Sequence, residues 1–189
     1  MDMERKNIEA ARLVLIGAIC GDIIGSCYEW RPTKDSDFKL FSVYSRFTDD
    51  TVCSIAIADA LMHSKPFAER LQYWCRKYPN AGYGGAYRKW IQSSNPLPYN
   101  SWGNGSAMRV SAVGAFARSL DEALDTAKAS AAVTHNHPEG VKGAQAVASA
   151  IFLALTGKSK EEVKEYIETT FGYNLSREYK DIQPGYRFD

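Results

Sequence analysis

Two adjacent carboxylates, Asp49 and Asp50, stand at the start of an apolar stretch, with Thr48 before them and Thr51 after them. Carboxylate and hydroxyl oxygens are hard ligands, which suit Mg²⁺, Mn²⁺ or Ca²⁺ better than zinc or copper. If Thr48 caps a helix here, the two aspartates leave its first turn about 100° apart and can address two neighbouring metal ions. The alternative is an ordinary acidic first turn that complements the helix dipole.

A third carboxylate, Glu29, follows a helix that apolar spacing predicts over residues 4–27. A glycine recurs at every fourth position of this helix and lowers its helix propensity, so we expect the glycines to let another backbone approach closely. We therefore expect this helix to be central. Glu29 then lies at the end of a buried helix, where it could supply a further oxygen ligand. The alternative is a solvated loop carboxylate. The glycines are Gly17, Gly21 and Gly25.

A second informative stretch is Gly103-Asn104-Gly105-Ser106-Ala107-Met108-Arg109, directly before a helix expected over residues 107–118. Glycines that free the backbone at a helix start place N–H groups where they can hold a phosphate. An ordinary glycine-rich turn is the alternative.

Two histidines, His135 and His137, lie two residues apart in a break between expected helices. They could be zinc ligands, but no cysteine or acidic residue stands nearby at a supporting spacing. We therefore expect a histidine that lines a polar pocket.

Helical spacing recurs through the rest of the chain, and no strand pattern emerges. Prolines at 66 and 138 open helices, glycines at 157 and 172 end them, and Ser119–Glu122 and Ser159–Glu162 read as capping boxes. The sequence therefore predicts an all-α fold. The further expected helices cover residues 51–63, 66–78, 86–92, 124–134, 138–156 and 159–171, and a polar tail with a turn at Pro184-Gly185 follows.

Composition predicts one globular domain over residues 1–189, because 45% of the residues are hydrophobic and can bury a substantial core. A net charge of +1 without any basic run disfavours nucleic acid as a partner. No stretch approaches the roughly 20 apolar residues of a membrane span. The apolar run Leu13–Cys20 follows basic residues as in a signal peptide, but Asp22 comes soon after it and no small-residue cleavage site follows.

Four cysteines, at positions 20, 27, 53 and 75, show no C-x-x-C spacing. A full apolar core makes disulfides unnecessary, so we interpret them as reduced and buried. A soluble, cytoplasmic protein is the expectation.

Four motifs together resemble those of the ADP-ribosylglycohydrolase family, in the same order and at similar spacing over about Leu13 to Ala154. The resemblance implies a compact all-α fold with a dinuclear Mg²⁺ or Mn²⁺ centre. It also implies hydrolysis of the bond between ADP-ribose and a protein side chain, or of a related ADP-ribose conjugate. The motifs are Gly21-Asp22 with Gly25 and Glu29, then Thr48-Asp49-Asp50-Thr51, then Gly103 to Arg109, then Thr134-His135.

The resemblance also implies roles for individual residues. Thr48, Asp49 and Asp50 match metal ligands, and Glu29 matches the carboxylate near the metals and the substrate. Glu29 and Asp50 are the candidates for general acid or base, because cleavage at C1 of a ribose builds oxocarbenium character and needs a positioned water. The loop matches the one that embraces the diphosphate and distal ribose, and His135 matches the pocket histidine. The loop residues are Gly103, Asn104, Gly105, Ser106 and Met108.

A second family motif, G-D-x-D-T, does not occur in these 189 residues. Its two aspartates and threonine complete the metal centre in the family, so we expect an incomplete ligand set and an uncovered helical face. Three hypotheses follow. The first is a hydrolase, expressed as a fragment or completed by self-association or a complementing chain. The second is a module that binds ADP-ribose without cleaving it, and the third is an inactive structural relative.

Overall fold

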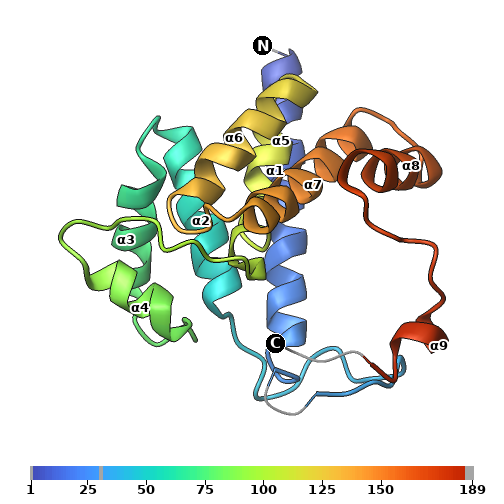
Figure 1. Ribbon diagram of the computed structural model, residues 1–189, viewed down its shortest axis with the longest axis horizontal. Helices are drawn as coiled ribbons and strands as arrows, with labels where there is room; N and C mark the ends of the chain where they lie inside the picture. Colours follow the sequence, from blue (N-terminus) through green and yellow to red (C-terminus); the bar gives the residue numbers. More distant parts are fainter. Residues whose placement is uncertain (1, 30–31, 186–189) are drawn as a thin grey trace.

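Helices make up the regular structure of the computed structural model, which describes residues 2–29 and 32–185, with side chains from residue 9 on. No strand occurs in this part of the chain, so the predicted all-α class is confirmed. Figure 1 shows the arrangement. The elements are α1 (Asp2–Gly25), α2 (Asp49–Met62), α3 (Phe67–Lys77), α4 (Gly85–Gln92), the 3₁₀ turn η1 (Asn104–Ser106), α5 (Ser111–Phe116), α6 (Leu120–Ala132), α7 (Pro138–Leu155), α8 (Lys160–Phe171) and α9 (Tyr179–Ile182).

The core is built around α2 and α5. Eight of the fourteen residues of α2 and five of the six residues of α5 are buried. Helix α5 packs against α1, α2, α6 and α7, and α3 covers another side of α2. This arrangement fixes the start of α2, where the paired aspartates lie.

Helix α1 is peripheral, contrary to the expectation that it is central. Ala11 is its one buried hydrophobic residue among the described side chains, while Leu13 and Ile16 are 62% and 53% exposed. A Cβ added at any of the three glycines would meet nothing within 4 Å, so the predicted close backbone approach is wrong for this part of the chain. The glycine side of α1 carries no partner here because the chain packs on its other side, through α2 and α5. The glycines are Gly17, Gly21 and Gly25.

The helix ends largely follow the predicted signals. Ser159 and Glu162 form a reciprocal capping box at α8, and Gly172 ends that helix with a left-handed φ of 72°. The box predicted at α6 is only half formed. Ser119 accepts a hydrogen bond from the Glu122 N–H, but the Glu122 carboxylate accepts from the N–H of Arg118, 2.8 Å away. An arginine one residue before the cap therefore captures the carboxylate.

Two segments differ from the prediction. The helix expected over residues 107–118 is the turn η1 followed by the short α5, with the buried Arg109 between them. The tail also contains α9, which was not expected. The side-chain amide of Gln183 and the hydroxyl of Tyr179 both donate to the Lys34 carbonyl, which ties the tail to the loop after Glu29. Figure 1 shows α9 beside this loop.

The four cysteines are free thiols, as interpreted, but they are not all buried. Cys20 is exposed and Cys27 is partly buried, whereas Cys53 and Cys75 lie in the core. The exposed thiol belongs to the uncovered side of α1.

Candidate functional site

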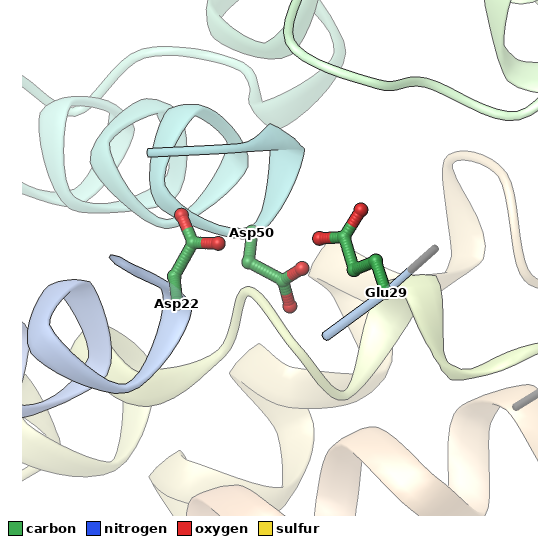
Figure 2. A group of neighbouring side chains, drawn as sticks. All are labelled: Asp22, Glu29 and Asp50. Carbon is green, nitrogen blue, oxygen red and sulfur yellow. The ribbon is translucent and has the colours of Figure 1, made fainter. Parts of the chain in front are cut away.

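Three carboxylates from separate segments meet beside the start of α2. Asp22 comes from the last turns of α1, Glu29 from the loop that follows, and Asp50 from the first turn of α2. One oxygen of each carboxylate lies within 4.8 Å of the others. Figure 2 shows Asp50 between the other two side chains. We call these three residues the acidic cluster.

Asp22 anchors the helix that carries Asp50. Its Oδ2 atom accepts hydrogen bonds from the backbone N–H groups of Thr48 and Thr51, at 2.7 and 3.2 Å, and from the Thr51 hydroxyl at 2.5 Å. Its Oδ1 atom accepts from the Thr48 hydroxyl at 2.5 Å. Thr48 stands at the predicted cap position, but its side chain makes no capping bond. The expected threonine cap is therefore wrong, because a carboxylate from α1 satisfies the free N–H groups instead.

The acidic cluster concentrates like charge. Burial, followed by the negative charge of Asp22, raises the pKa of Asp50 above its usual value. Partial burial and the charges of Asp22 and Asp50 raise the pKa of Glu29, which Arg46 partly offsets. Carboxylates in this arrangement favour either protons or a cation. Three oxygen donors of the hard type, close together and poorly neutralised, fit a Mg²⁺ or Mn²⁺ ion.

Asp49 faces a different space from Asp50. It lines a cavity of about 320 Å³, whose wall also contains the Gly103 loop and His135. Burial and the neighbouring Asp50 charge raise the pKa of Asp49 to about 6. The two adjacent aspartates thus diverge from the first turn of α2, one toward the acidic cluster and one toward the cavity. The remaining lining residues are Gly84, Gly85, Ala86, Tyr87, Tyr99, Ser101, Asn104, Gly105, Met108 and Arg109.

The Gly103 loop packs closely against His135 because Gly105, its second glycine, has no side chain. A Cβ added at Gly105 would lie 2.9 Å from Nε2 of His135, so the loop and the imidazole pack closer than any side chain there would permit. Ser106 does not line the cavity, since it is fully buried and its hydroxyl donates to the Gly140 carbonyl at 2.7 Å. The other predicted loop residues, Gly103, Asn104, Gly105 and Met108, do line the cavity.

A buried chain of hydrogen bonds orients His135. Arg109 donates to the Thr134 hydroxyl at 2.9 Å, and that hydroxyl lies 2.7 Å from Nδ1 of His135. Because arginine can only donate, the Thr134 oxygen accepts from Arg109, and the same hydroxyl meets Nδ1 of His135. The other ring nitrogen, Nε2, lies beside Gly105. Burial and the nearby Arg109 charge lower the pKa of His135 to about 4, which keeps the ring neutral.

The second histidine has a local structural role. Nδ1 of His137 accepts from the Glu139 N–H at 3.1 Å and caps α7. Within residues 9–29 and 32–185, the group of three or more possible metal ligands that comes together contains carboxylates and no histidine. This arrangement disfavours the zinc alternative.

Sequence reasoning gave no role to Asp22 and Arg109, and it treated Thr51 only as a hydroxyl ligand beside the paired aspartates. Asp22 and Thr51 belonged to quoted motifs, yet their mutual hydrogen bonds depend on the packing of α1 against α2. Arg109 was placed on a helix, whereas it is 1% exposed and supports His135 from behind. An arginine amid small apolar residues could have signalled burial, but its partners are 21 and 25 positions away.

The fold and site define an all-helical protein with an acidic, cation-suited cluster next to a cavity that a glycine loop and a neutral histidine line. Comparison with known proteins agrees: residues 3–186 match the family model described as ADP-ribosylglycohydrolase. The chain belongs to the ADP-ribosylglycohydrolase family.

Individual relatives support this assignment. ADP-ribosylhydrolase ARH3 of Bos taurus is 29% identical over 203 residues, which cover 89% of this chain and 55% of that protein. ADP-ribosylhydrolase ARH3 of Homo sapiens is 30% identical, over 83% of this chain and 53% of that protein. ADP-ribosylarginine hydrolase Tri1 of Pseudomonas putida (strain GB-1) is 28% identical, over 82% and 49%. The chain spans about half the length of these relatives.

Proposed function

We propose that this chain forms part of a metal-dependent hydrolase that cleaves the glycosidic bond between ADP-ribose and a protein side chain or a related conjugate. One observation carries the proposal. A single cavity has Asp49, next to the acidic cluster, on one wall and the glycine loop with His135 on another. An anion held by the loop would therefore lie close to metal-suited carboxylates.

The carboxylates Asp49 and Asp50, with the Thr48 hydroxyl, are the proposed ligands of Mg²⁺ or Mn²⁺, and Asp22 and Glu29 add oxygens to the same neighbourhood. Two ions bound here would orient ribose hydroxyls and lower the pKa of a bound water. The raised pKa values of Asp49 and Asp50 support this assignment, because a cation relieves the repulsion that burial intensifies.

Acid and base roles are proposed for Glu29 and Asp50. Hydrolysis at C1 of a ribose needs one group to take a proton from water and one to protonate the leaving group. Glu29 is exposed on a loop, so it can reach solvent water or a departing side chain, whereas Asp50 is held in a helix turn. Glu29 and Asp50 are the candidates for these two roles, and the exposure of Glu29 favours it as the base.

The Gly103 loop and His135 are the proposed contacts for the diphosphate and distal ribose. With its proton on Nε2, beside Gly105, the neutral His135 would donate to a ligand oxygen without a change in protonation. Asn104 and Met108 line the same wall. Ser106 supports this loop from behind through Gly140 rather than through the cavity.

Further oxygen ligands are proposed to come from a complementing segment or a second copy of the chain. The exposed side of α1, with Leu13, Ile16 and the glycine positions, is an apolar face on the helix that carries Asp22. Among the helices of residues 2–29 and 32–185, none combines the length and the apolar composition of a membrane span. The four free thiols fit a reducing compartment, and we propose the cytoplasm.

Calorimetric titration of Mn²⁺ into the metal-free protein, with and without ADP-ribose, tests the proposal. We expect Mn²⁺ to bind, and to bind more tightly when ADP-ribose is present. In a separate assay with an ADP-ribosylated peptide, we expect the Mn²⁺-loaded protein to release ADP-ribose. ADP-ribose binding without any turnover would favour the non-catalytic module instead. Failure to bind either ligand at millimolar concentration would overturn both hypotheses.

A further inference from the structure

Two buried thiols lie next to each other directly behind the candidate site. Sγ of Cys53 on α2 is 3.8 Å from Sγ of Cys75 on α3. The Tyr87 hydroxyl lies 3.6 Å from the first sulfur and 3.5 Å from the second. Tyr87 also lines the cavity that contains Asp49, so this thiol pair and the candidate site share a residue.

The two thiols differ in what they border. Both are buried, at 0% exposed for Cys53 and 1% for Cys75, but Cys75 also lines a separate cavity of about 270 Å³, together with Tyr83 and Arg88. A water molecule occupies about 30 Å³ of liquid, so a peroxide molecule fits this space. Hydrogen bonds, above all with Cys53, lower the pKa of Cys75, while the same contact and burial raise the pKa of Cys53. The sulfur beside the cavity is therefore the one placed to meet peroxide, and the thiolate is its reactive form.

We propose that Cys53 and Cys75 are a reversible redox pair that hydrogen peroxide converts to an intramolecular disulfide. The Cys75 thiolate attacks one peroxide oxygen, the O–O bond breaks, and hydroxide leaves, which forms a sulfenic acid. The Cys53 sulfur then attacks Sγ of Cys75, and the sulfenic oxygen leaves as water with the Cys53 proton. Two thiols are oxidised by two electrons, and one peroxide is reduced.

Disulfide formation has a structural consequence for the candidate site. The sulfur atoms must approach from 3.8 Å to about 2.05 Å, which draws α2 and α3 together. Cys53 follows Asp49 by one helical turn, and Tyr87 loses both thiol partners. Oxidation should therefore displace Asp49, and we expect Mn²⁺ affinity to fall by about tenfold, because such sites tolerate little misplacement. This consequence rests on the proposed function, whereas the disulfide does not.

The test uses the variant Cys20→Ser/Cys27→Ser, which removes the two more accessible thiols and leaves the core unchanged. After treatment of the folded protein with hydrogen peroxide, we expect a mass loss of two hydrogen atoms, about 2 Da, that dithiothreitol reverses. Peptide mapping should link the peptide of Cys53 to that of Cys75. Helical circular dichroism recorded alongside verifies that oxidation occurs in the native state.

The outcomes separate the two proposals. A linked peptide pair in folded protein supports the redox pair even if the reduced protein binds no Mn²⁺, a result that would count only against the proposed function. Persistence of both thiols, or stable oxidation of Cys75 to a sulfinic acid without linkage, would overturn the redox pair. Retained Mn²⁺ affinity in the fully oxidised protein would overturn its coupling to the site.

Discussion

Two regions of the candidate site, the histidine wall of the cavity and the acidic cluster beside it, differ in how completely this chain satisfies their polar groups. On the histidine wall, which comprises Gly105, Arg109, Thr134 and His135, hydrogen bonds within this chain link the three side chains, and a lowered pKa keeps the imidazole neutral. In the acidic cluster, carboxylates face one another, and the pKa values of Glu29 and Asp50 are raised by burial and by like charge. The histidine wall is already ordered for a ligand. In the acidic cluster, repulsion between like charges is unfavourable until a proton or a cation binds.

Asp22 explains why the acidic cluster forms despite this repulsion. Its carboxylate accepts four hydrogen bonds from Thr48 and Thr51, so this member of the cluster also holds α1 to the start of α2. Asp50 has no comparable role, since the hydrogen bond that its side chain makes within the described residues is a long one of 3.4 Å from the Thr48 hydroxyl. The cluster thus combines a structural carboxylate with carboxylates that are costly without a cation.

The largest effect is expected for Asp22→Ala. Loss of this carboxylate leaves the start of α2 without its acceptors and should lower the free energy of unfolding by about 3 kcal/mol, after partial relief of repulsion. Urea unfolding in the presence of a chelator measures the change. The matched control is Glu29→Gln on the exposed loop, which should leave stability nearly unchanged. Equal stability of both variants would remove the distinction between structural and metal-suited carboxylates.

The next effect concerns metal affinity. Asp50→Asn should weaken Mn²⁺ binding by about 100-fold, or about 2.7 kcal/mol, because it removes a charged oxygen from the cluster. Its stability without metal should stay the same or rise. Calorimetry and helical circular dichroism measure the two properties. Asp121→Asn is the control, because Asp121 is likewise an acidic residue in a helix first turn, on α6. An equal loss of affinity in both variants would contradict the assignment of Asp50.

A smaller effect should follow Gly105→Ala on the histidine wall. The added Cβ would lie 2.9 Å from Nε2 of His135 and should cost about 2 kcal/mol of stability, together with most ADP-ribose affinity. Gly103→Ala is the control, since its nearest neighbour would be an ordinary 3.7 Å away. Thermal unfolding and ligand titration compare the two. If both substitutions were tolerated alike, the close packing of the loop on the imidazole would not matter.

Local sequence signals predicted much of the fold. Pro138, Ser159 and Gly172 fixed helix ends that the structure reproduces, because proline, capping hydroxyls and left-handed glycine act through neighbouring backbone. The prediction failed where a long-range partner decides the outcome. Arg109 was assigned to a helix, but its bonds to Ser130 and Thr134 hold the chain in a turn before α5.

The candidate site shows the same limit. The pairing of Asp49 with Asp50 was visible in sequence, and so was the glycine loop. The capping of α2 by Asp22 was not, because it depends on how α1 lies against α2 and overrides the expected role of Thr48. The glycines of α1 predicted a buried contact that the described chain does not make, since a stripe of small residues says nothing about which partner covers it.

The smallest effect is the pH dependence of stability that the Asp49 carboxylate imposes. The pKa of Asp49 is raised to about 6, so the folded protein holds its proton more tightly than the unfolded chain, whose aspartates titrate near 4. Its favourable contribution is thus complete below about pH 4 and is lost as pH rises through about 6. Relative to Asp49→Asn, the free energy of unfolding of the metal-free wild-type protein should fall by about 1 kcal/mol between about pH 4 and pH 6. The effect is smaller than the full pKa shift implies because solvent partly screens this side chain. Saturating Mn²⁺ should reverse the slope, because the ion binds the ionised carboxylate. Parallel curves for the protein and its variant, measured by urea unfolding, would show that Asp49 experiences no such repulsion.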